Sequence, residues 1–317
     1  MSKYLVTGGA GFIGSNIVEE LLLRGETVRV LDNLSTGKEE NLAPFMDRID
    51  FRKGDIRSEN DVKSALKDIS FVIHQAALGS VPRSLKNPGA TNDVNVSGTL
   101  NILMLAKQER VKRVIYASSS SVYGNCKDFP QKESFEPRPM SPYAVSKFSA
   151  ELYCRMFAET MGLETVRLRY FNVFGPRQDP ASQYAAAIPT FISALNNDRP
   201  CVIHGQGSQS RDFTFISRVV EANLAACEIS GISGGVFNVA FGKEHSILEL
   251  SETIKKILGK QIESIHAPRR PGDMNRSLAD IRRLTDILKV ENDVNFYKAL
   301  EQTTEWFVGN YSAAMEL

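Results

Sequence analysis

The chain has 317 residues, of which 42% are hydrophobic and 24% are charged. This composition is ordinary for a soluble globular protein and can bury a large core, in one large domain or in two closely associated ones. Because 38 basic residues balance 37 acidic ones, the net charge is +1, and neither nucleic acid nor a membrane surface is indicated as the main partner.

Short runs of β-branched residues alternate with helical patterns through the first half of the chain. This alternation is typical of an α/β protein with a Rossmann-like, doubly wound parallel sheet. The predicted strands are Tyr4–Gly8, Thr27–Asp32, Ile49–Ile56, Ser70–Ala77, Val111–Ser119 and Glu164–Val173. The predicted helices are Phe12–Leu23, Asp61–Leu66, Asn92–Gln108 and Tyr143–Met161.

After Asn172 the pattern becomes less regular. The stretches FGPRQDP and HGQGSQSRDF have the composition of loops, and helical patterns follow at Val219–Ile229, Ile247–Leu258 and Tyr297–Val308. No low-complexity linker separates this part from the first half. We therefore expect a smaller C-terminal α/β lobe packed on the first part.

The cysteines and histidines are dispersed along the chain. The four cysteines form no CxxC pair, so neither a metal site nor a disulfide framework is expected. Met1 runs directly into strand-like sequence without a charged and then apolar leader, and no apolar run reaches the roughly 18 residues of a membrane span. These features predict a cytoplasmic protein with no membrane association.

The stretch TGGAGFIG joins the first predicted strand to the first predicted helix and spaces Gly8, Gly11 and Gly14 as GxxGxxG. Glycines let the backbone approach a pyrophosphate, and the helix N-terminus offers free amides and a partial positive charge. Asp32 ends the second strand, where a carboxylate can bind a ribose diol and repels a phosphate on that ribose. This context predicts NAD rather than NADP, with a merely structural turn as the alternative.

The stretch SPYAVSK places Tyr143 and Lys147 four residues apart, so that both side chains lie on one face of a predicted helix. A tyrosine of pKa about 10 is a poor base at neutral pH, but a nearby ammonium and an oxidised nicotinamide favour the phenolate. To lower the tyrosine pKa by about 3 units, these charges must stabilise the phenolate by roughly 4 kcal/mol. The pair is a candidate for proton transfer, with a chance pairing on a helix as the alternative.

Several motifs occur in order over nearly the whole chain: TGGAGFIG, DNLSTG, the strand end HQAA, SSSSVYG, SPYAVSK, RYFNVFGP and RRPGD. On these motifs the chain resembles an extended short-chain dehydrogenase/reductase of the NAD-dependent epimerase/dehydratase family, which acts on nucleotide sugars. The resemblance implies an NAD-binding Rossmann domain at residues 1–172, with a returning segment around 211–242. It implies a UDP-sugar-binding lobe at residues 173–210 and 243–317.

The resemblance also implies which residues bind the cofactor. Asp55 and Ile56, after the third predicted strand, are expected to border the adenine, with an ordinary strand-end turn as the alternative. The residues expected at NAD are Gly8, Gly11, Phe12, Ile13, Gly14, Asp32, Asn33, Ser35, Thr36, Gly37, Asp55, Ile56, Gln75, Ala76, Ala77, Tyr143, Lys147 and Tyr170.

By the same resemblance, the catalytic hydroxyl lies three residues before the Val of VYG, at Ser119. Relatives that dehydrate their sugar carry Asp-Glu at the next two positions, and relatives that decarboxylate usually carry Glu just before the Val. Here these positions are Ser120 and Ser121, and a hydroxyl cannot serve as general acid or base for those steps near neutral pH. We therefore expect epimerisation without elimination. Both serines are expected to contact the sugar or its N-acetyl group, with simple turn chemistry as the alternative.

The implied reaction passes through a transient 4-keto sugar. Tyr143 takes the proton of the hydroxyl on carbon 4 while the hydrogen of that carbon passes as hydride to bound NAD. The sugar then rotates about the bonds to its diphosphate, the hydride returns to its other face, and Tyr143 gives back the proton. Because the cofactor is regenerated in every turnover, it is expected to remain bound.

The resemblance supplies candidates that hold the substrate. Asn172 matches an asparagine at the substrate phosphates, and Arg211 and Arg270 match two arginines that clamp the diphosphate, with a solvated surface charge as the alternative. Asp273 matches an acid associated with the uridine ribose. The residues expected at the substrate are Ser84, Ser119, Ser120, Ser121, Tyr143, Asn172, Ala187, Arg211, Arg270, Asp273 and Ser277.

Ser277 bears on the identity of the sugar. At this position, family members that handle only non-acetylated hexoses tend to carry Tyr, and those that also accept N-acetyl sugars carry Cys or Ser. A hydroxymethyl group leaves space for an acetamido group, and the alternative is an exposed polar residue. The stretch Arg177–Phe191 is also most similar to the UDP-N-acetylglucosamine 4-epimerase subgroup. We therefore expect interconversion of UDP-GlcNAc and UDP-GalNAc, with UDP-glucose and UDP-galactose as poorer substrates.

Two other functions stay open. One is 4-epimerisation of another UDP-sugar, such as UDP-glucose, UDP-glucuronate or another decorated N-acetyl sugar. The other is a non-catalytic NAD-binding regulator, which the presence of Ser119, Tyr143 and Lys147 disfavours. The family also implies a homodimer in which Asn92–Gln108 and Tyr143–Met161 pair with their copies in a four-helix bundle, although an apolar helix face can be core instead.

Overall fold

The computed structural model describes residues 3–180, 186–269, 275–291 and 294–311. Within these residues, seven parallel strands form one sheet in the order β11-β6-β5-β4-β1-β2-β3, so the predicted doubly wound parallel sheet is confirmed. The strand order reverses between β1 and β4, where such sheets bind ligands at their carboxyl edge. The strands are β1 (Lys3–Thr7), β2 (Thr27–Asp32), β3 (Asp50–Lys53), β4 (Phe71–His74), β5 (Arg113–Ser119), β6 (Glu164–Tyr170) and β11 (Val236–Val239).

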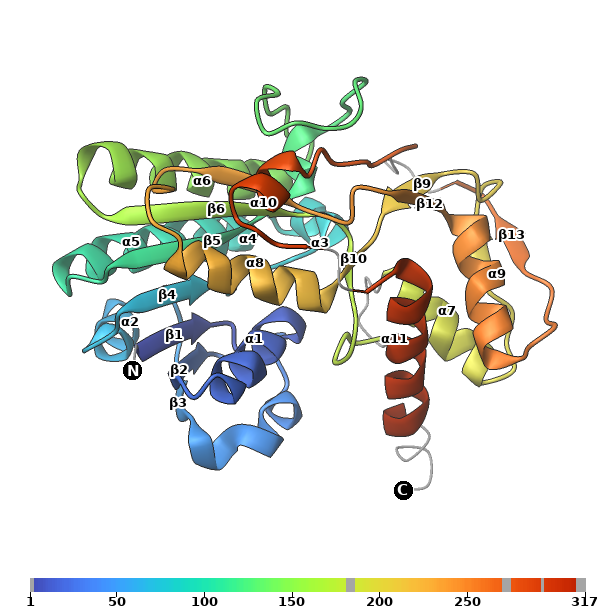
Figure 1. Ribbon diagram of the computed structural model, residues 1–317, viewed down its shortest axis with the longest axis horizontal. Helices are drawn as coiled ribbons and strands as arrows, with labels where there is room; N and C mark the ends of the chain where they lie inside the picture. The colour runs from blue at the N-terminus through green and yellow to red at the C-terminus, as the bar shows by residue number, and fades with distance from the viewer. Residues whose placement is uncertain (1–2, 181–185, 270–274, 292–293, 312–317) are drawn as a thin grey trace.

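Helices cover both faces of this sheet (Figure 1). Neighbouring strand residues point to opposite faces, so Val30 enters the core beneath α1 and α8, whereas Leu31 enters the core beneath α2, α5 and α6. Burial on both faces explains the apolar runs YLV in β1, FVI in β4 and VIYA in β5. The helices are α1 (Phe12–Leu23), α2 (Glu59–Leu66), α5 (Thr99–Gln108), α6 (Pro142–Thr160) and α8 (Ile216–Glu228).

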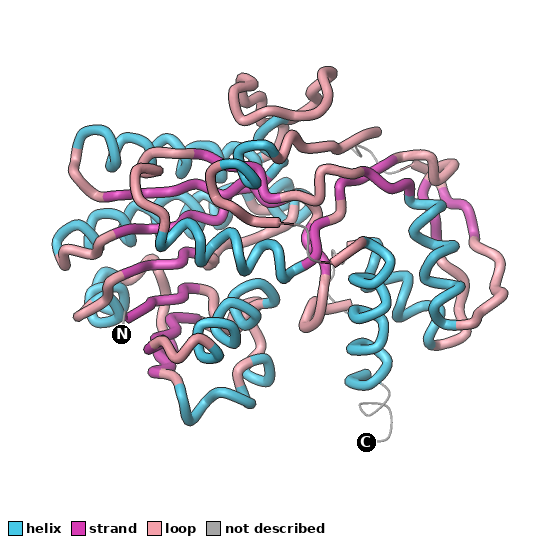
Figure 2. The backbone as a smooth tube through the Cα atoms, viewed as in Figure 1, coloured by secondary structure: helices cyan, strands magenta, loops and turns pink. Residues whose placement is uncertain are grey.

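A smaller part of the molecule lies to the right of the sheet in Figure 1. The chain enters it through loops and the parallel pair β7–β10 (Figure 2). Two further small sheets pair β12 with β9 and β13 with β8. Its elements are β7 (Val173–Phe174), α7 (Ala187–Asn196), β8 (Val202–His204), β9 (Ser210–Asp212), β10 (Thr214–Phe215), β12 (Glu244–Ser246), α9 (Ile247–Leu258), β13 (Ile265–Ala267) and α11 (Phe296–Tyr311).

The remaining helices are short. The predicted helix from Asn92 to Gln108 is helical throughout, but a π-helical turn at Asp93–Gly98 joins its first residue to α5. A 3₁₀ turn, η4, follows β5 and carries two of the predicted substrate residues. These elements are α3 (Val81–Lys86), α4 (Pro88–Asn92), η4 (Ser120–Tyr123), α10 (Arg282–Asp286) and the 3₁₀ turns Glu39–Asn41 and Ala43–Arg48.

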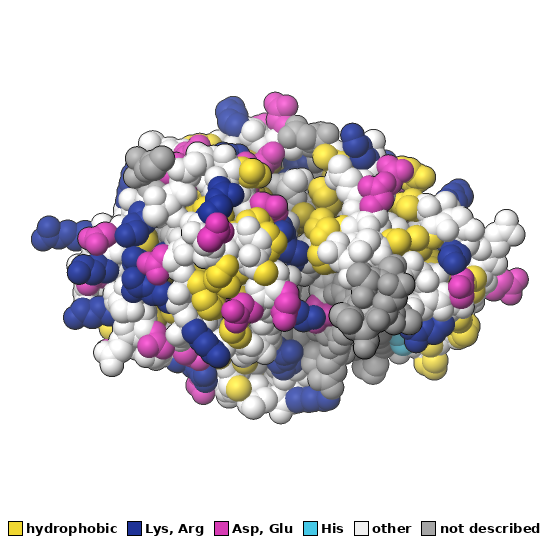
Figure 3. Space-filling model, turned by 90° about the horizontal axis from the view of Figure 1, so that it is seen from below, with side chains coloured by type: hydrophobic (Ala, Val, Ile, Leu, Met, Phe, Trp, Pro, Cys, Tyr) yellow, Lys and Arg dark blue, Asp and Glu magenta, His cyan; other side chains and the backbone are white. Residues whose placement is uncertain are grey.

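The described residues contain neither a membrane-spanning helix nor a disulfide. Across the described ranges, no helix combines the length and the apolar character that a membrane span requires. The four cysteines are free thiols. On the face seen from below in Figure 3, side chains of both charge signs are interspersed.

Candidate active site and nucleotide cavities

The glycine loop lies at the carboxyl edge of the sheet, where β1 turns into α1. Gly8 has a φ of 70°, and a Cβ placed on it would lie 2.7 Å from the backbone nitrogen of Ala76. A Cβ on Gly14 would overlap the Gly8 carbonyl oxygen and lie 2.7 Å from the Cα of Gly9. Glycine is therefore required at both positions because backbone segments approach too closely for a side chain.

A cavity of about 330 Å³ opens beside this loop. Most of the predicted cofactor residues line it, from the glycine loop, the ends of β2 and β4 and the segment after β3. The predicted residues in its wall are Gly8, Gly11, Phe12, Ile13, Gly14, Asp32, Asn33, Ser35, Thr36, Gly37, Ile56, Gln75, Ala76 and Ala77. Prediction missed Leu31, Gly54, Leu78, Gly79 and Val94, which carry no polar signal in the sequence.

Asp32 lies in the wall of this cavity and is largely buried. Its carboxylate accepts hydrogen bonds from the backbone amides of Ala10, at 2.9 Å, and Leu34, at 2.8 Å. Burial raises the pKa of Asp32, and these two amides act in the opposite direction. The N-terminus of α1 at Gly11 has no side-chain cap, so its amides are available to a ligand. A glycine cradle, free helix amides and an acid at the end of β2 fit a dinucleotide whose adenosine ribose carries no phosphate.

Two predicted cofactor residues lie behind the wall. The Asp55 carboxylate accepts a hydrogen bond from the Asn33 side chain at 2.8 Å and pairs with Arg57 at 2.7 Å. The hydroxyl of Tyr170 accepts hydrogen bonds from the side-chain amides of Gln75, at 3.0 Å, and Asn223, at 2.8 Å. Asp55 and Tyr170 therefore support Asn33 and Gln75, which line the cavity.

Ser119, Tyr143 and Lys147 come together where β5 meets the start of α6. The Ser119 hydroxyl lies close enough to the Tyr143 phenol to oppose the effect of burial on the pKa of that phenol. The Lys147 ammonium donates to the Ala117 carbonyl at 2.8 Å and lies 6.0 Å from the centroid of the Tyr143 ring. Ser141 caps α6 by accepting from the amide of Ala144, which fixes the first turn on which Tyr143 lies.

The protonation of these groups is set mainly by burial. Burial raises the pKa of Tyr143, and the hydrogen bond with Ser119 lowers it, with a net upward direction. Burial lowers the pKa of Lys147 to about 8, while Cys154 and Glu151 raise it. Lys147 by itself therefore does not bring the pKa of Tyr143 below its ordinary value. His74 is fully buried, which lowers its pKa to about 3, so it is neutral at physiological pH.

The three serines at the end of β5 differ in their hydrogen bonds. The Ser119 hydroxyl also accepts from the backbone amide of Ser121 at 3.2 Å. The Ser121 hydroxyl is buried without a hydrogen-bond partner, and Ser120 is half-buried beside it. Ser84 is fully buried, and its hydroxyl donates to the Val81 carbonyl at 2.7 Å within α3. The sugar contact predicted for Ser84 stays a prediction, for a side chain that is buried in this structure.

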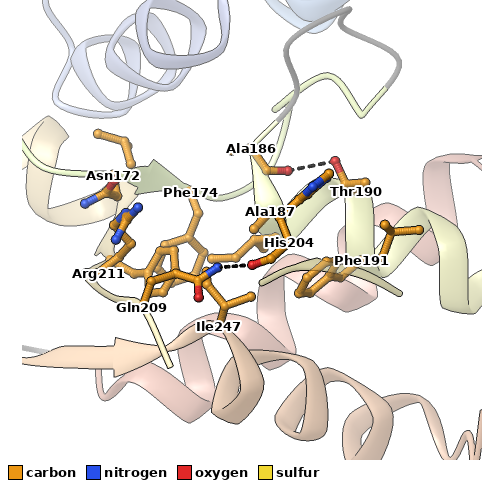
Figure 4. A pocket seen from close by; sticks show the side chains of 14 residues that line it. Asn172, Phe174, Ala186, Ala187, Thr190, Phe191, His204, Gln209, Arg211 and Ile247 are labelled. Atoms are coloured by element: carbon orange, nitrogen blue, oxygen red, sulfur yellow. Dashed lines mark hydrogen bonds between the residues drawn. The ribbon is translucent and has the colours of Figure 1, made fainter. Parts of the chain in front are cut away.

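A second cavity, of about 250 Å³, lies in the smaller part of the molecule (Figure 4). Asn172, Ala187 and Arg211 line it, as expected for substrate residues, and Asn172 and Arg211 lie side by side at one end. Aromatic and apolar side chains form most of the remaining wall. Prediction missed Val173, Phe174, Ala186, Ile188, Thr190, Phe191, Val202, His204, Gln209, Phe213 and Ile247.

Asn172 turns the chain from β6 into this cavity. Its φ of 33° is in the left-handed region, which asparagine tolerates better than most residues. Its side-chain amide donates to the Asp212 carbonyl at 2.9 Å and lies 3.5 Å from the Ser277 hydroxyl. Ser277 is only 1% exposed, so its interpretation as an exposed polar residue is wrong. Arg270 and Asp273 lie outside the described residues.

Comparison with known proteins agrees with this geometry. The model of the NAD dependent epimerase/dehydratase family matches residues 4–240. The chain belongs to this family. UDP-N-acetylglucosamine 4-epimerase from Methanobrevibacter ruminantium M1, solved in complex with UDP-N-acetylmuramic acid, is 44% identical, with a TM-score of 0.92 over 97% of this chain and 98% of that one.

Two further relatives cover almost the whole chain. UDP-glucose 4-epimerase from Thermus thermophilus, solved in complex with NAD, is 36% identical, with a TM-score of 0.89 over 97% of this chain and 99% of that one. A putative UDP-glucose 4-epimerase of Methanocaldococcus jannaschii is 37% identical over 308 residues, covering 96% of this chain and 98% of that protein. The predicted family, enzyme class and cofactor are confirmed: the chain is an NAD-dependent nucleotide-sugar 4-epimerase.

Proposed function

We propose that this epimerase interconverts UDP-GlcNAc and UDP-GalNAc, with UDP-glucose and UDP-galactose as poorer substrates. The observation that carries the proposal is the end of β5, which presents Ser119, Ser120 and Ser121 and no carboxylate at these positions. A 4-keto sugar formed there has no general acid or base from these positions to remove water or carbon dioxide. The small side chain of Ser277 beside Asn172 supports an N-acetyl sugar, as does the similarity to a UDP-N-acetylglucosamine 4-epimerase.

In this proposal each catalytic side chain has one role. Tyr143 accepts the proton of the hydroxyl on carbon 4 and later returns it, and Ser119 hydrogen-bonds that sugar hydroxyl and positions it against Tyr143. Lys147, held by the Ala117 carbonyl, places a positive charge near the Tyr143 ring. When bound, NAD supplies the hydride acceptor and donor that interconverts alcohol and ketone at carbon 4. Its adenosine ribose would be held by Asp32.

The second cavity would hold the nucleotide. Arg211 is placed to bind the diphosphate beside Asn172, and Arg270 and Asp273 remain proposed contacts to the diphosphate and the uridine ribose. We propose that residues 1–172 and 211–242 form an NAD-binding domain and that residues 173–210 and 243–317 form a UDP-sugar-binding lobe. Firm binding of the nucleotide leaves the sugar free to rotate between the two hydride transfers.

The test is to incubate the purified protein with UDP-GlcNAc without added NAD and to separate the epimers. Formation of UDP-GalNAc would support both the reaction and a retained cofactor. A panel with UDP-glucose, UDP-galactose and UDP-glucuronate gives the specificity. Turnover of the acidic sugar alone, or release of water or carbon dioxide, would refute the proposal, and a lack of turnover for every UDP-sugar would favour the non-catalytic regulator.

We also propose that the enzyme is a cytoplasmic homodimer in which α5 and α6 pair with their copies. Met104 on α5 and Val145 and Leu152 on α6 are 41–48% exposed, and such exposed apolar side chains on two adjacent helices support this pairing. The charged variant Leu152→Asp should reduce the mass measured by light scattering to that of a monomer. A monomeric wild type would refute the dimer.

A further inference from the structure

A buried carboxylate lies directly behind the catalytic side chains. Glu151 is on α6, one helical turn beyond Lys147 and two turns beyond Tyr143, so the three side chains lie along one face of the helix. The hydroxyl of Ser118 donates to the Glu151 carboxylate at 2.5 Å. Ser118 directly precedes Ser119 and directly follows the residue whose carbonyl holds Lys147. Ala117 and Ser118 at the end of β5 are thus each bound by a side chain of α6, and Ser119 follows them beside Tyr143.

The carboxylate is itself fixed from the neighbouring strand. Glu151 has no exposed surface, and Arg169 donates to it from Nε at 2.9 Å and from Nη2 at 2.8 Å. Arg169 is the partner of Ser118 in the β5–β6 register, and its guanidinium lies 4.7 Å from the centroid of the Tyr123 ring. The Tyr123 hydroxyl donates to Asn238 on β11 at 2.6 Å. The network therefore connects α6, β5, β6, η4 and β11.

We propose that Glu151, fixed by Arg169, is a positioning residue that sets the end of β5 against α6 and so aligns Ser119 and Tyr143 for proton transfer. This inference rests on the proposed function, because it presupposes that Tyr143 exchanges a proton with a sugar hydroxyl. Without the carboxylate, the Ser118 hydroxyl and the guanidinium lose their shared partner, and the end of β5 is free to move relative to α6. A misplacement of about 1 Å at reacting groups can reduce the rate by about 100-fold.

The carboxylate also acts on the charge of Lys147. Burial lowers the pKa of Lys147, and Cys154 and Glu151 raise it. Without the Glu151 charge the ammonium loses its proton at a lower pH, and the Tyr143 phenol then ionises at a higher pH. The charged and titratable groups packed around the two residues are Tyr143 and Cys154 on α6, Tyr116 on β5, His74 on β4, Arg167 and Arg169 on β6 and Tyr123 in η4.

The test compares Glu151→Gln with Glu159→Gln, which removes an exposed carboxylate on the same helix, 3.9 Å from Arg155. Epimerisation of UDP-GlcNAc is followed as kcat and KM over a range of pH. We expect Glu151→Gln to lower kcat by about 10- to 100-fold with little change in KM, and to begin its alkaline loss of activity at lower pH. Glu159→Gln should behave as the wild type.

Two more variants separate positioning from stability. Ser118→Ala removes one hydroxyl and leaves the ion pair, so it should fold normally and still lower kcat. The double variant Glu151→Leu with Arg169→Met replaces the buried pair by apolar groups, which often leaves stability unchanged. The double variant should have the melting temperature of the wild type but a lower kcat. Wild-type kcat and pH profile in folded Ser118→Ala or in the double variant would overturn the inference.

A readout without turnover distinguishes this inference from the proposed function. Ionisation of Tyr143 is the part of the alkaline absorbance change that is missing in Tyr143→Phe. In Glu151→Gln this part should appear at higher pH than in the wild type, and an unchanged position would refute the role of Glu151. If the wild type epimerises no UDP-sugar, the proposed function fails, and the proposed alignment for proton transfer fails with it. If the wild type epimerises a UDP-sugar and Glu151→Gln has the same kcat and pH profile, only the inference about Glu151 is refuted.

Discussion

Gly14→Ala tests how closely α1 must approach the loop that precedes it. A Cβ on Gly14 would overlap the Gly8 carbonyl oxygen and lie 2.9 Å from the Gly8 carbonyl carbon and 2.7 Å from the Gly9 Cα. The Gly8 amide donates to Leu31 on the neighbouring strand at 2.9 Å, so this backbone cannot rotate away as a side chain can. The added methyl group must therefore push the N-terminus of α1 off the sheet.

The magnitude follows from this packing. Extra methyl groups in a close-packed interior cost about 1–3 kcal/mol, and contact with backbone favours the upper end of that range. Alanine returns at most about 1 kcal/mol through its helix propensity. We therefore expect the free energy of unfolding to fall by about 2 kcal/mol, which lowers the melting temperature of a chain of 317 residues by roughly 3 °C. The shifted helix amides should also reduce the NAD retained through purification.

The assay measures the melting temperature and the NAD released per chain on denaturation. Gly309→Ala is the matched control, because Gly309 lies in α11 and a Cβ there meets no atom within 4 Å. It should raise the free energy of unfolding by about 0.5–1 kcal/mol and leave the NAD content unchanged. A Gly14→Ala protein with wild-type melting temperature and NAD content would refute the close-approach argument.

Three further predictions concern single side chains. Tyr143→Phe should lower kcat by about 10²- to 10⁴-fold while UDP-sugar binding persists. The control Tyr153→Phe on the same helix should keep the wild-type kcat. A wild-type kcat in Tyr143→Phe would show that Tyr143 does not transfer the proton. Arg211→Met should raise the calorimetric Kd of UDP by about 10- to 100-fold, because a charged hydrogen bond contributes about 1.5–3 kcal/mol, and unchanged affinity would place the diphosphate elsewhere. Burial lowers the pKa of His74 to about 3, below its unfolded value near 6.5. The contribution of neutral His74 to the free energy of unfolding is therefore complete above pH 6.5 and is lost as the pH falls toward 3. When the pH is lowered from 7 to 5, the free energy of unfolding measured by urea titration should therefore fall by about 2 kcal/mol less in His74→Gln than in the wild type. An equal fall in both proteins would contradict this.

The sheet and its covering helices could be predicted because their signals are local. The bounds predicted for β2, α1 and α9 agree with the structure, since an apolar run or stripe specifies each of them. The stretch HGQGSQSRDF has the composition of a loop, yet it contains β9. A three-residue strand is defined by its pairing with β12, which no local pattern reveals.

The cavity beside the glycine loop was predictable for the same reason, and the wall of the second cavity was not. The glycine loop and Asp32 lie within one β-α-β unit, so their spacing in the sequence fixes their arrangement in space. The wall of the second cavity takes Phe191 from α7, His204 from β8 and Ile247 from α9. Apolar residues at such positions have the same pattern as core residues, so only the tertiary fold shows that they face a cavity.

Tyr143 shows why a motif alone does not give a reactive group. Burial raises the pKa of Tyr143, and the one hydroxyl that opposes this, Ser119, does not reverse the direction. The Lys147 ammonium is fixed by the Ala117 carbonyl 6.0 Å from the phenol ring, and its own pKa falls to about 8. The protein thus builds a dry, aligned site in which the phenol stays protonated.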